Sequence, residues 1–329
     1  MKIALDVMGT DYGPKELVLG AVQAVKEFNC EIVLVGDPET IENLLREYKA
    51  DTDSRLSICP ATEVVRMDEH PSIAVKTKKN SSIVVATRLL REKKCDALVS
   101  SGSTGAAVAG RIKGIERPAI ATPIPNLTGT TVLLDSGAKV DAKPEHMVQS
   151  ALMGSVYSEL MFGVEKPRVG LLNIGEEETK GNEQALATYP LMKEEQHINF
   201  IGNVEGRDIN KGTVDVVVCD GFVGNVVLKF AEGLASAIMV VIKDAISKGG
   251  LMAKLGGLLL LPTMKALKKR ADVSECGGAL LLGVKAPFII CHGNSKAKSI
   301  TSAVRVAINF AERDVVKHIA EIVIKDEEK

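Results

Sequence analysis

Short apolar runs, many of them rich in β-branched residues, alternate with amphipathic stretches along most of the chain. The runs have the length of strands, and most are followed by a segment with helical spacing, such as the one from Pro14 to Phe28 that begins with a proline. This alternation predicts a mostly parallel sheet with helices on both faces, a three-layer α/β/α fold. The predicted strands cover residues 3–7, 31–35, 56–59, 96–100, 131–135, 168–173 and 216–218.

The stretch 215–233, DVVVCDGFVGNVVLKFAEG, combines a buried strand, a glycine turn and the start of a helix. Asp220 lies where the strand should end, and Asn225 has a side chain suited to cap the helix. Amide N–H groups at such a turn bind anions, because a helix N-terminus follows the carboxyl end of a parallel strand. The stretch therefore predicts an anion site, and the alternative interpretation is a well-made structural turn.

Hydroxyl groups and glycines follow the predicted strand at 96–100, in the sequence SSGSTG. They suit an oxyanion site, although a serine-rich helix cap is the alternative. No G-K-[ST] follows and no G-x-G-x-x-G occurs in the chain, which argues against a nucleotide. We expect one phosphate site built from residues that follow several strands: Ser101, Ser103, Thr104, Asn225 and Lys180.

Lys180 belongs to the polar segment after the strand at 168–173, where its charge could pair with phosphate. The three acids at 176–178 fit a solvated loop better than a metal site, because no His or Asp stands beside them at ligand spacing. His292, in ICHGNS, lies between an apolar run and a glycine turn, which is a position suited to a general acid. We predict His292, Asp220 and Lys180 as catalytic residues, with Asp220 orienting His292; the alternative is a structural imidazole.

The composition is that of an ordinary globular chain, with 329 residues, 46% hydrophobic, 25% charged and a formal net charge of -1. Nucleic-acid binding is not expected, because there is no basic excess and aromatic residues make up only 3%. Six cysteines without C-x-x-C spacing predict a reducing cytosol and no zinc. No repeat or linker divides the chain, so we expect a single domain, 1–329.

A helical projection is predicted over roughly residues 233–275. It contains LMAKLGGLLLLP (251–262), with expected breaks at the glycine pairs 249–250 and 256–257. No uncharged apolar run approaches the roughly 20 residues of a membrane span, so we expect nothing to cross a bilayer. Shallow insertion of an apolar tip fits better, and core burial is the alternative. The predicted tip consists of Leu258, Leu259, Leu260 and Leu261.

Together these motifs resemble the bacterial phosphate acyltransferase family, the acyl-carrier-protein:phosphate transacylases of phospholipid synthesis. The resemblance covers nearly the whole chain, and its longest blocks are the most specific. It is carried by DVMGTD (6–11), KTKKNSS (76–82), SSGSTGA (100–106), LLDSGAKVDAKPEH (133–146), VGLLNIGEEETKGN (169–182), FIGNVEGRDI (200–209), the stretch 215–233, GGALLLGV (277–284) and CHGNS (291–295).

This resemblance implies a fold similar to the phosphotransacetylase and isopropylmalate dehydrogenase group, a homodimer, and no cofactor. It also implies that the enzyme converts long-chain acyl-acyl-carrier protein and inorganic phosphate to acyl phosphate. The product would supply a membrane glycerol-3-phosphate acyltransferase, so we expect a cytoplasmic protein attached peripherally to the inner face of the membrane. Carrier proteins are acidic, so we expect docking on a basic segment, for which a solvated helix face is the alternative: Lys265, Lys268, Lys269 and Arg270.

Two other functions remain to be weighed. A hydroxy-acid dehydrogenase of the same fold group would need a nicotinamide site and a metal held by aspartates, and neither signature is visible. A non-catalytic protein that docks carrier protein at the membrane would not need the polar loops after so many strands.

Overall fold

The computed structural model describes residues 1–8, 10, 12–65, 69, 71–101, 110–271 and 277–327, and at 71–72, 265–271 and 325–327 it describes only the main chain. Within this part of the chain, one mixed sheet has the strand order β3-β2-β1-β4-β11-β10-β5-β6-β9-β7-β8. Most neighbouring strands are parallel and helices lie on both faces, so the predicted α/β architecture is confirmed.

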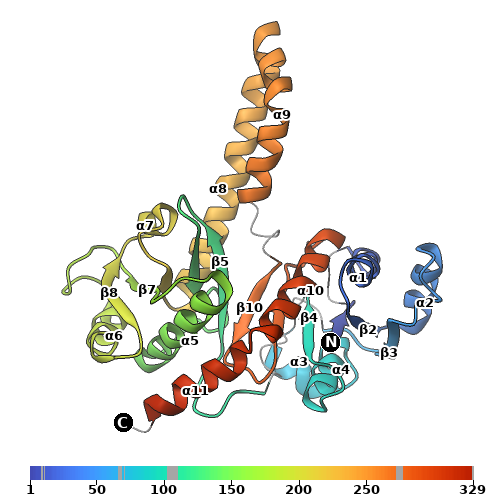
Figure 1. The fold of residues 1–329 in the computed structure, drawn as a ribbon, viewed down its shortest axis with the longest axis horizontal. Helices are drawn as coiled ribbons and strands as arrows, with labels where there is room; N and C mark the ends of the chain where they lie inside the picture. Colours follow the sequence, from blue (N-terminus) through green and yellow to red (C-terminus); the bar gives the residue numbers. More distant parts are fainter. Residues whose placement is uncertain are drawn as a thin grey trace.

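The first half of the sheet is a parallel set whose apolar residues alternate between the two faces. Helices α1 (Pro14–Glu27) and α10 (Ala297–Glu312) pack together on one face, and α4 (Ser82–Arg91) covers the other. Helix α2 (Pro38–Glu47) lies at the outer end of the sheet beside β3 (Figure 1), and α3 (Pro71–Thr77) precedes α4 along the chain. The strands are β1 (Lys2–Asp6), β2 (Glu31–Gly36), β3 (Leu56–Pro60), β4 (Ala97–Ser100) and β11 (Phe288–Ile290).

The second half is another parallel set, with α5 (Pro144–Phe162) and α6 (Glu183–Glu194) on one face. Helix α7 (Gly206–Lys211) and the beginning of α8 (Gly221–Lys248) cover the opposite face. Helix α11 (Val315–Glu327) continues from the first half and packs against α5, which ties the halves together (Figure 1). The strands are β6 (Thr130–Leu134), β9 (Val216–Val218), β7 (Arg168–Leu172) and β8 (Asn199–Val204).

Two strands that the hydrophobic pattern did not predict, β5 (Ala119–Pro125) and β10 (Ala279–Leu282), join the two sets. Strand β10 is antiparallel to both β11 and β5, and β5 is antiparallel to β6. The second parallel set therefore runs in the opposite direction to the first. Its carboxyl ends lie at the other edge of the sheet, which decides which loops can meet.

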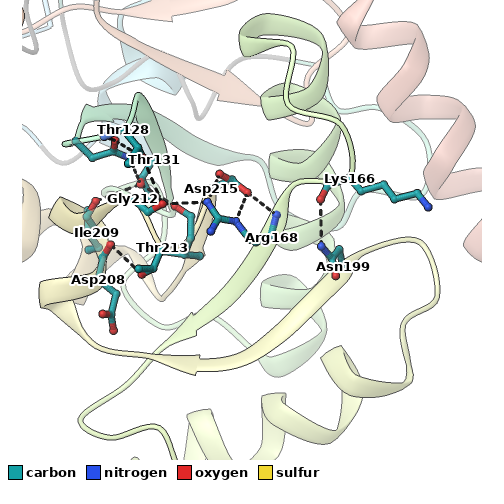
Figure 2. A network of polar contacts seen from close by, with 12 residues as sticks. Thr128, Thr131, Lys166, Arg168, Asn199, Asp208, Ile209, Gly212, Thr213 and Asp215 are labelled. Atoms are coloured by element: carbon teal, nitrogen blue, oxygen red, sulfur yellow. Dashed lines mark hydrogen bonds and ion pairs between the residues drawn. The ribbon is translucent and has the colours of Figure 1, made fainter.

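An ion pair at the start of β7 fixes the second set, as Figure 2 shows. The Arg168 guanidinium donates to both carboxylate oxygens of Asp215, each at 2.9 Å, and also to the carbonyl of Gly212 at 3.0 Å. The main-chain N–H of Arg168 donates to the same carboxylate at 2.8 Å. Burial acts to raise the pKa of Asp215, but the hydrogen bonds from Arg168 outweigh it and keep that pKa below its usual value.

Asp215→Asn should lower the free energy of unfolding by about 1–2 kcal/mol, because Arg168 loses a charged, two-pronged partner. Because the pKa is depressed in the folded state, the contribution is present above the ordinary value of 3.8 and is lost as the pH falls through the folded value. Denaturant unfolding of parent and variant at pH 7 and at pH 3 would measure this. Equal stability of both proteins at pH 7 would contradict it.

Helices α8 and α9 (Leu251–Ala271) form an antiparallel hairpin that projects from the body, as predicted (Figure 1). The predicted break at the second glycine pair is wrong, because α9 continues through Gly256, Gly257 and Pro262. Glycine inside a helix costs only about 1 kcal/mol. At Gly257 a Cβ would collide with Ile246 of α8, so the small residue lets the two helices approach closely.

The predicted apolar tip is also wrong in its position, because the hairpin turns at Gly249 and Gly250. At 1.5 Å per residue, Leu258 lies about 12 Å back from the turn along α9. The four leucines 258–261 are exposed along the shaft, whereas Leu251 and Met252, 83% and 80% exposed, stand at the tip.

Helix α8 has the length and apolar composition of a membrane span, with a mean hydropathy of 1.7 over its most apolar window and 6% of that window buried. This helix contains no long uncharged run, because Lys229 and Glu232 interrupt its apolar sequence. Its first turns pack on the body, where Leu228 is buried.

Candidate active site

Polar side chains gather at the carboxyl ends of the first parallel set, where Asp6, Ser100 and Ile290 stand in one row of the sheet. The Ser100 hydroxyl donates to the Asp6 carboxylate at 3.0 Å, and the N–H of Met8 donates to it at 3.2 Å. Burial raises the pKa of Asp6, although hydrogen bonds from Ser82, Met8 and Ser100 partly oppose this. Asp6 was not among the predicted site residues. The sequence signal for it is a carboxylate at the end of a predicted strand.

Ser101 follows Ser100 at this edge and is 1% exposed. Its hydroxyl has no hydrogen-bond partner among the described residues. A buried hydroxyl without a partner costs about 1–3 kcal/mol, which is often accepted where a ligand or water completes the bond. The other predicted hydroxyls of this loop, Ser103 and Thr104, lie outside the described residues.

His292 stands on the neighbouring strand end, two residues after β11. Its Nε2 lies 3.1 Å from Oε1 of Glu232 on α8, and 48% of its side chain is exposed. The hydrogen bond to Glu232 raises the pKa of His292 above its ordinary value, against burial and the charge of Lys229. A histidine with a carboxylate partner has the arrangement expected of a general acid, and Glu232 was not predicted.

Asp220 is not the partner of His292, which corrects the predicted orienting role. Its carboxylate caps α8 by accepting the N–H groups of Phe222 and Val223, both at 2.9 Å. Glu232 is twelve positions further along the same helix, which corresponds to about 18 Å along its axis. Asn225, expected as the cap, instead lies one turn inside the helix beside Gly137.

Asp135, at the end of β6, organises the loop that faces this helix start. One carboxylate oxygen accepts the N–H groups of Ile120, Gly137 and Ala138, and the other accepts that of Lys139, at 2.8 to 3.0 Å. Burial raises the pKa of Asp135, and these four hydrogen bonds oppose the rise. The carbonyl of Asp135 leaves no room for a side chain at Gly224. The turn after β9 is therefore locked against the loop after β6.

Lys180 lies in a cavity of 470 Å³ at the carboxyl ends of β7 and β8. The main-chain N–H of Lys180 donates to the carbonyl of Glu177 at 3.1 Å, and the main-chain carbonyl of Lys180 accepts from the side-chain amide of Asn173 at 3.0 Å. The residues that line this cavity do not include Ser101, Asn225 or His292. The lining residues are Ile174, Gly175, Glu176, Glu177, Lys180, Glu205 and Arg207.

The structure therefore separates the predicted site residues into groups. Ser101 and His292 lie together at the end of the first strand set, while Lys180 and Asn225 lie at the opposite edge. Within one chain they do not surround a single phosphate, because β5 and β10 reverse the direction of the second set. Within the described ranges, no three metal-binding side chains form a cluster.

The predicted docking segment occupies the end of α9 that returns to the body. The side chains of Lys265, Lys268, Lys269 and Arg270 lie outside the described set.

Residues 1–318 match the family described as "Fatty acid synthesis protein". A "Phosphate acyltransferase" from Heliobacterium modesticaldum is 54% identical over 327 residues, covering 98% of this chain and 97% of that protein. A second, from Desulfitobacterium hafniense, is 54% identical over 326 residues, covering 97% and 96%. The fold is similar to that of a phosphotransacetylase from Streptococcus pyogenes, with a TM-score of 0.63, 16% identity and coverage of 95% and 94%.

Proposed function

The chain belongs to the fatty acid synthesis protein family, and from this we propose that it transfers a long-chain acyl group from acyl-carrier protein to inorganic phosphate. It is an acyltransferase of lipid synthesis whose relatives are phosphate acyltransferases. To this we add, as the proposed part, acyl-carrier protein as the acyl donor and a long acyl chain. The acyl phosphate product then serves a membrane glycerol-3-phosphate acyltransferase.

The observation that carries the proposal is the juxtaposition of two groups on neighbouring strands. One is the buried hydroxyl of Ser101, which has no hydrogen-bond partner in the described part of the chain, and the other is His292 with its carboxylate partner. A phosphate oxygen attacks the thioester carbon, and the carbonyl electrons move to oxygen. When the tetrahedral intermediate collapses, the carbon–sulfur bond breaks and the carrier thiolate leaves. Ser101 helps to hold the attacking phosphate, and protonated His292 donates to the oxyanion or to the departing sulfur.

The test is incubation of the protein with palmitoyl-acyl-carrier protein and inorganic phosphate. Acyl phosphate and free carrier thiol should appear in equal amounts, and both should be missing when phosphate is left out. Binding of the carrier protein without turnover would contradict the proposal and favour a docking protein.

We also propose a homodimer, in which a second copy covers an apolar stripe of α8. Residues spaced by four along this helix carry large side chains, each 47% to 69% exposed, and because each step turns about 40° they form a stripe that winds around the helix. Exposed apolar side chains that lie next to one another in this way mark an interaction surface. Light scattering should give twice the chain mass, and Phe230→Glu should shift it towards the monomer. The residues are Phe222, Val226, Phe230, Leu234 and Ile238.

Peripheral attachment to the inner face of the cell membrane is a further part of the proposal. Leu251, Met252 and Leu255 expose apolar surface at the hairpin end, beside Lys248 and Lys254. Such a combination favours shallow insertion into an anionic leaflet.

The parent protein should sediment with phosphatidylglycerol vesicles. Leu251→Glu with Met252→Glu should weaken this about 100-fold, since each buried apolar side chain contributes about 1.5 kcal/mol or more. Leu259→Glu with Leu260→Glu is the matched control on the shaft and should have the smaller effect. Transferase activity in solution should survive the tip variant, and a parent that ignores the vesicles would refute membrane attachment.

A further inference from the structure

An ion pair links the root of the projecting hairpin to the body. Leu228 is the last buried residue of α8, and a Cβ added at Gly233 would meet nothing within 4 Å. Glu232 lies between these two positions and reaches back to the body, where its Oε1 lies 3.1 Å from Nε2 of His292. The root of the hairpin is thus in direct contact with the strand end that carries the proposed acid.

The main chain around His292 is held independently of this contact. The N–H of Cys291 donates to the carbonyl of Ser100 at 2.8 Å, and that of Ser295 donates to the carbonyl of His292 at 3.0 Å. These hydrogen bonds fix the main chain of His292. They fix neither the orientation of its imidazole ring nor the protonation state of that ring. The half-exposed ring depends for both on the side chain that faces it, and Glu232 is the carboxylate in that place.

We infer that Glu232 is a positioning residue, which orients the His292 ring and keeps it protonated for the acyl transfer. The inference rests on the proposed function, because it assigns His292 the role of proton donor. Glu232 acts through the histidine and does not itself touch the reacting groups.

The charges around the ring set the direction of the expected effects. On α8, Glu232 raises the pKa of His292 and Lys229 lowers it. On the loop of the histidine itself, Cys291 is neutral near pH 7, because burial raises its pKa to about 12, and Lys296 is the nearest cation in sequence. Removing the charge of Glu232 therefore lowers the pKa of His292, and removing that of Lys229 raises it.

The decisive variant is Glu232→Gln, which keeps the shape and a hydrogen-bond acceptor but removes the charge. The alkaline limb of its kcat/KM profile should move down by about one pH unit, as expected for the loss of a partly exposed opposite charge. The His292 imidazole resonance, assigned with His292→Gln, should titrate at correspondingly lower pH. Lys229→Gln is the matched control and should shift both quantities upward, while Glu232→Asp should restore part of the parent profile.

The readouts separate the ways in which the inference can fail. An unchanged imidazole titration in Glu232→Gln, with His292→Ala inactive, would overturn the positioning role and leave His292 as the acid. A shifted titration with an unchanged rate profile, and with His292→Ala active, would show that His292 is not the acid and would overturn the inference together with that part of the proposed function.

Discussion

His292→Ala is expected to lower kcat by about 10² to 10⁴, because general acid help to the departing group is lost. The apparent affinity for phosphate should change much less, since the imidazole acts on the thioester side of the reaction. In the parent, kcat/KM should fall as the pH rises through the pKa of His292, which Glu232 holds above its ordinary value. Steady-state kinetics with acyl-carrier protein and phosphate at several pH values would measure both effects.

The matched control for this variant is His197→Ala. His197 lies between α6 and β8, where its Nδ1 is 2.9 Å from Glu195 and it contacts neither Ser101 nor Glu232. It should retain near-normal turnover. A folded His292→Ala protein with turnover within a factor of three of the parent would leave His292 with a structural role only.

The second large effect is expected at Asp135, on stability. Asp135→Ala removes a carboxylate that is 4% exposed and accepts four main-chain N–H groups. Hydrogen bonds to a charged acceptor contribute about 1.5–3 kcal/mol each and do not add fully, so the variant should lose about 3–5 kcal/mol of unfolding free energy. Denaturant unfolding followed by circular dichroism would measure the loss.

Asp135→Asn is the graded control for this prediction. It keeps one acceptor oxygen for the loop but turns an NH₂ group towards the N–H of Lys139, so its stability should lie between those of the parent and the alanine variant. A loss below 1 kcal/mol in Asp135→Ala would show that water replaces the carboxylate without cost. The loop would then contribute little to the packing of Gly221 and Gly224.

The local pattern of the sequence predicted most strands and the projecting hairpin. The apolar run at 216–218 is β9, and the helix that begins at Pro14 ends within one residue of the expected position. These features depend on neighbouring residues, because strand and helix periods, prolines and glycine pairs act within a few positions. That Ser101 and His292 lie after strand ends was also predicted in this way, since both follow apolar runs.

The cap of α8 depends on contacts beyond its own stretch of sequence. Asp220 and Asn225 both have side chains that cap helices, and the pattern of 215–233 favoured the later residue. The main chain bends at Asp220 because Gly221 and Gly224 pack closely on the loop after β6, where a Cβ at Gly221 would lie 2.6 Å from the carbonyl of Lys139. That loop is remote in the sequence, so the local pattern could not predict its contact with the turn.

The sequence by itself determined the kinds of elements, their approximate ends and the family to which their motifs belong. Only the tertiary structure decided that β5 and β10 reverse the second strand set, which sends Lys180 and Asn225 to the edge away from Ser101 and His292. It likewise decided that Glu232, and not Asp220, meets the histidine. Strand direction and side-chain partners depend on contacts between distant segments, and a pattern that repeats every two or four residues carries no information about them.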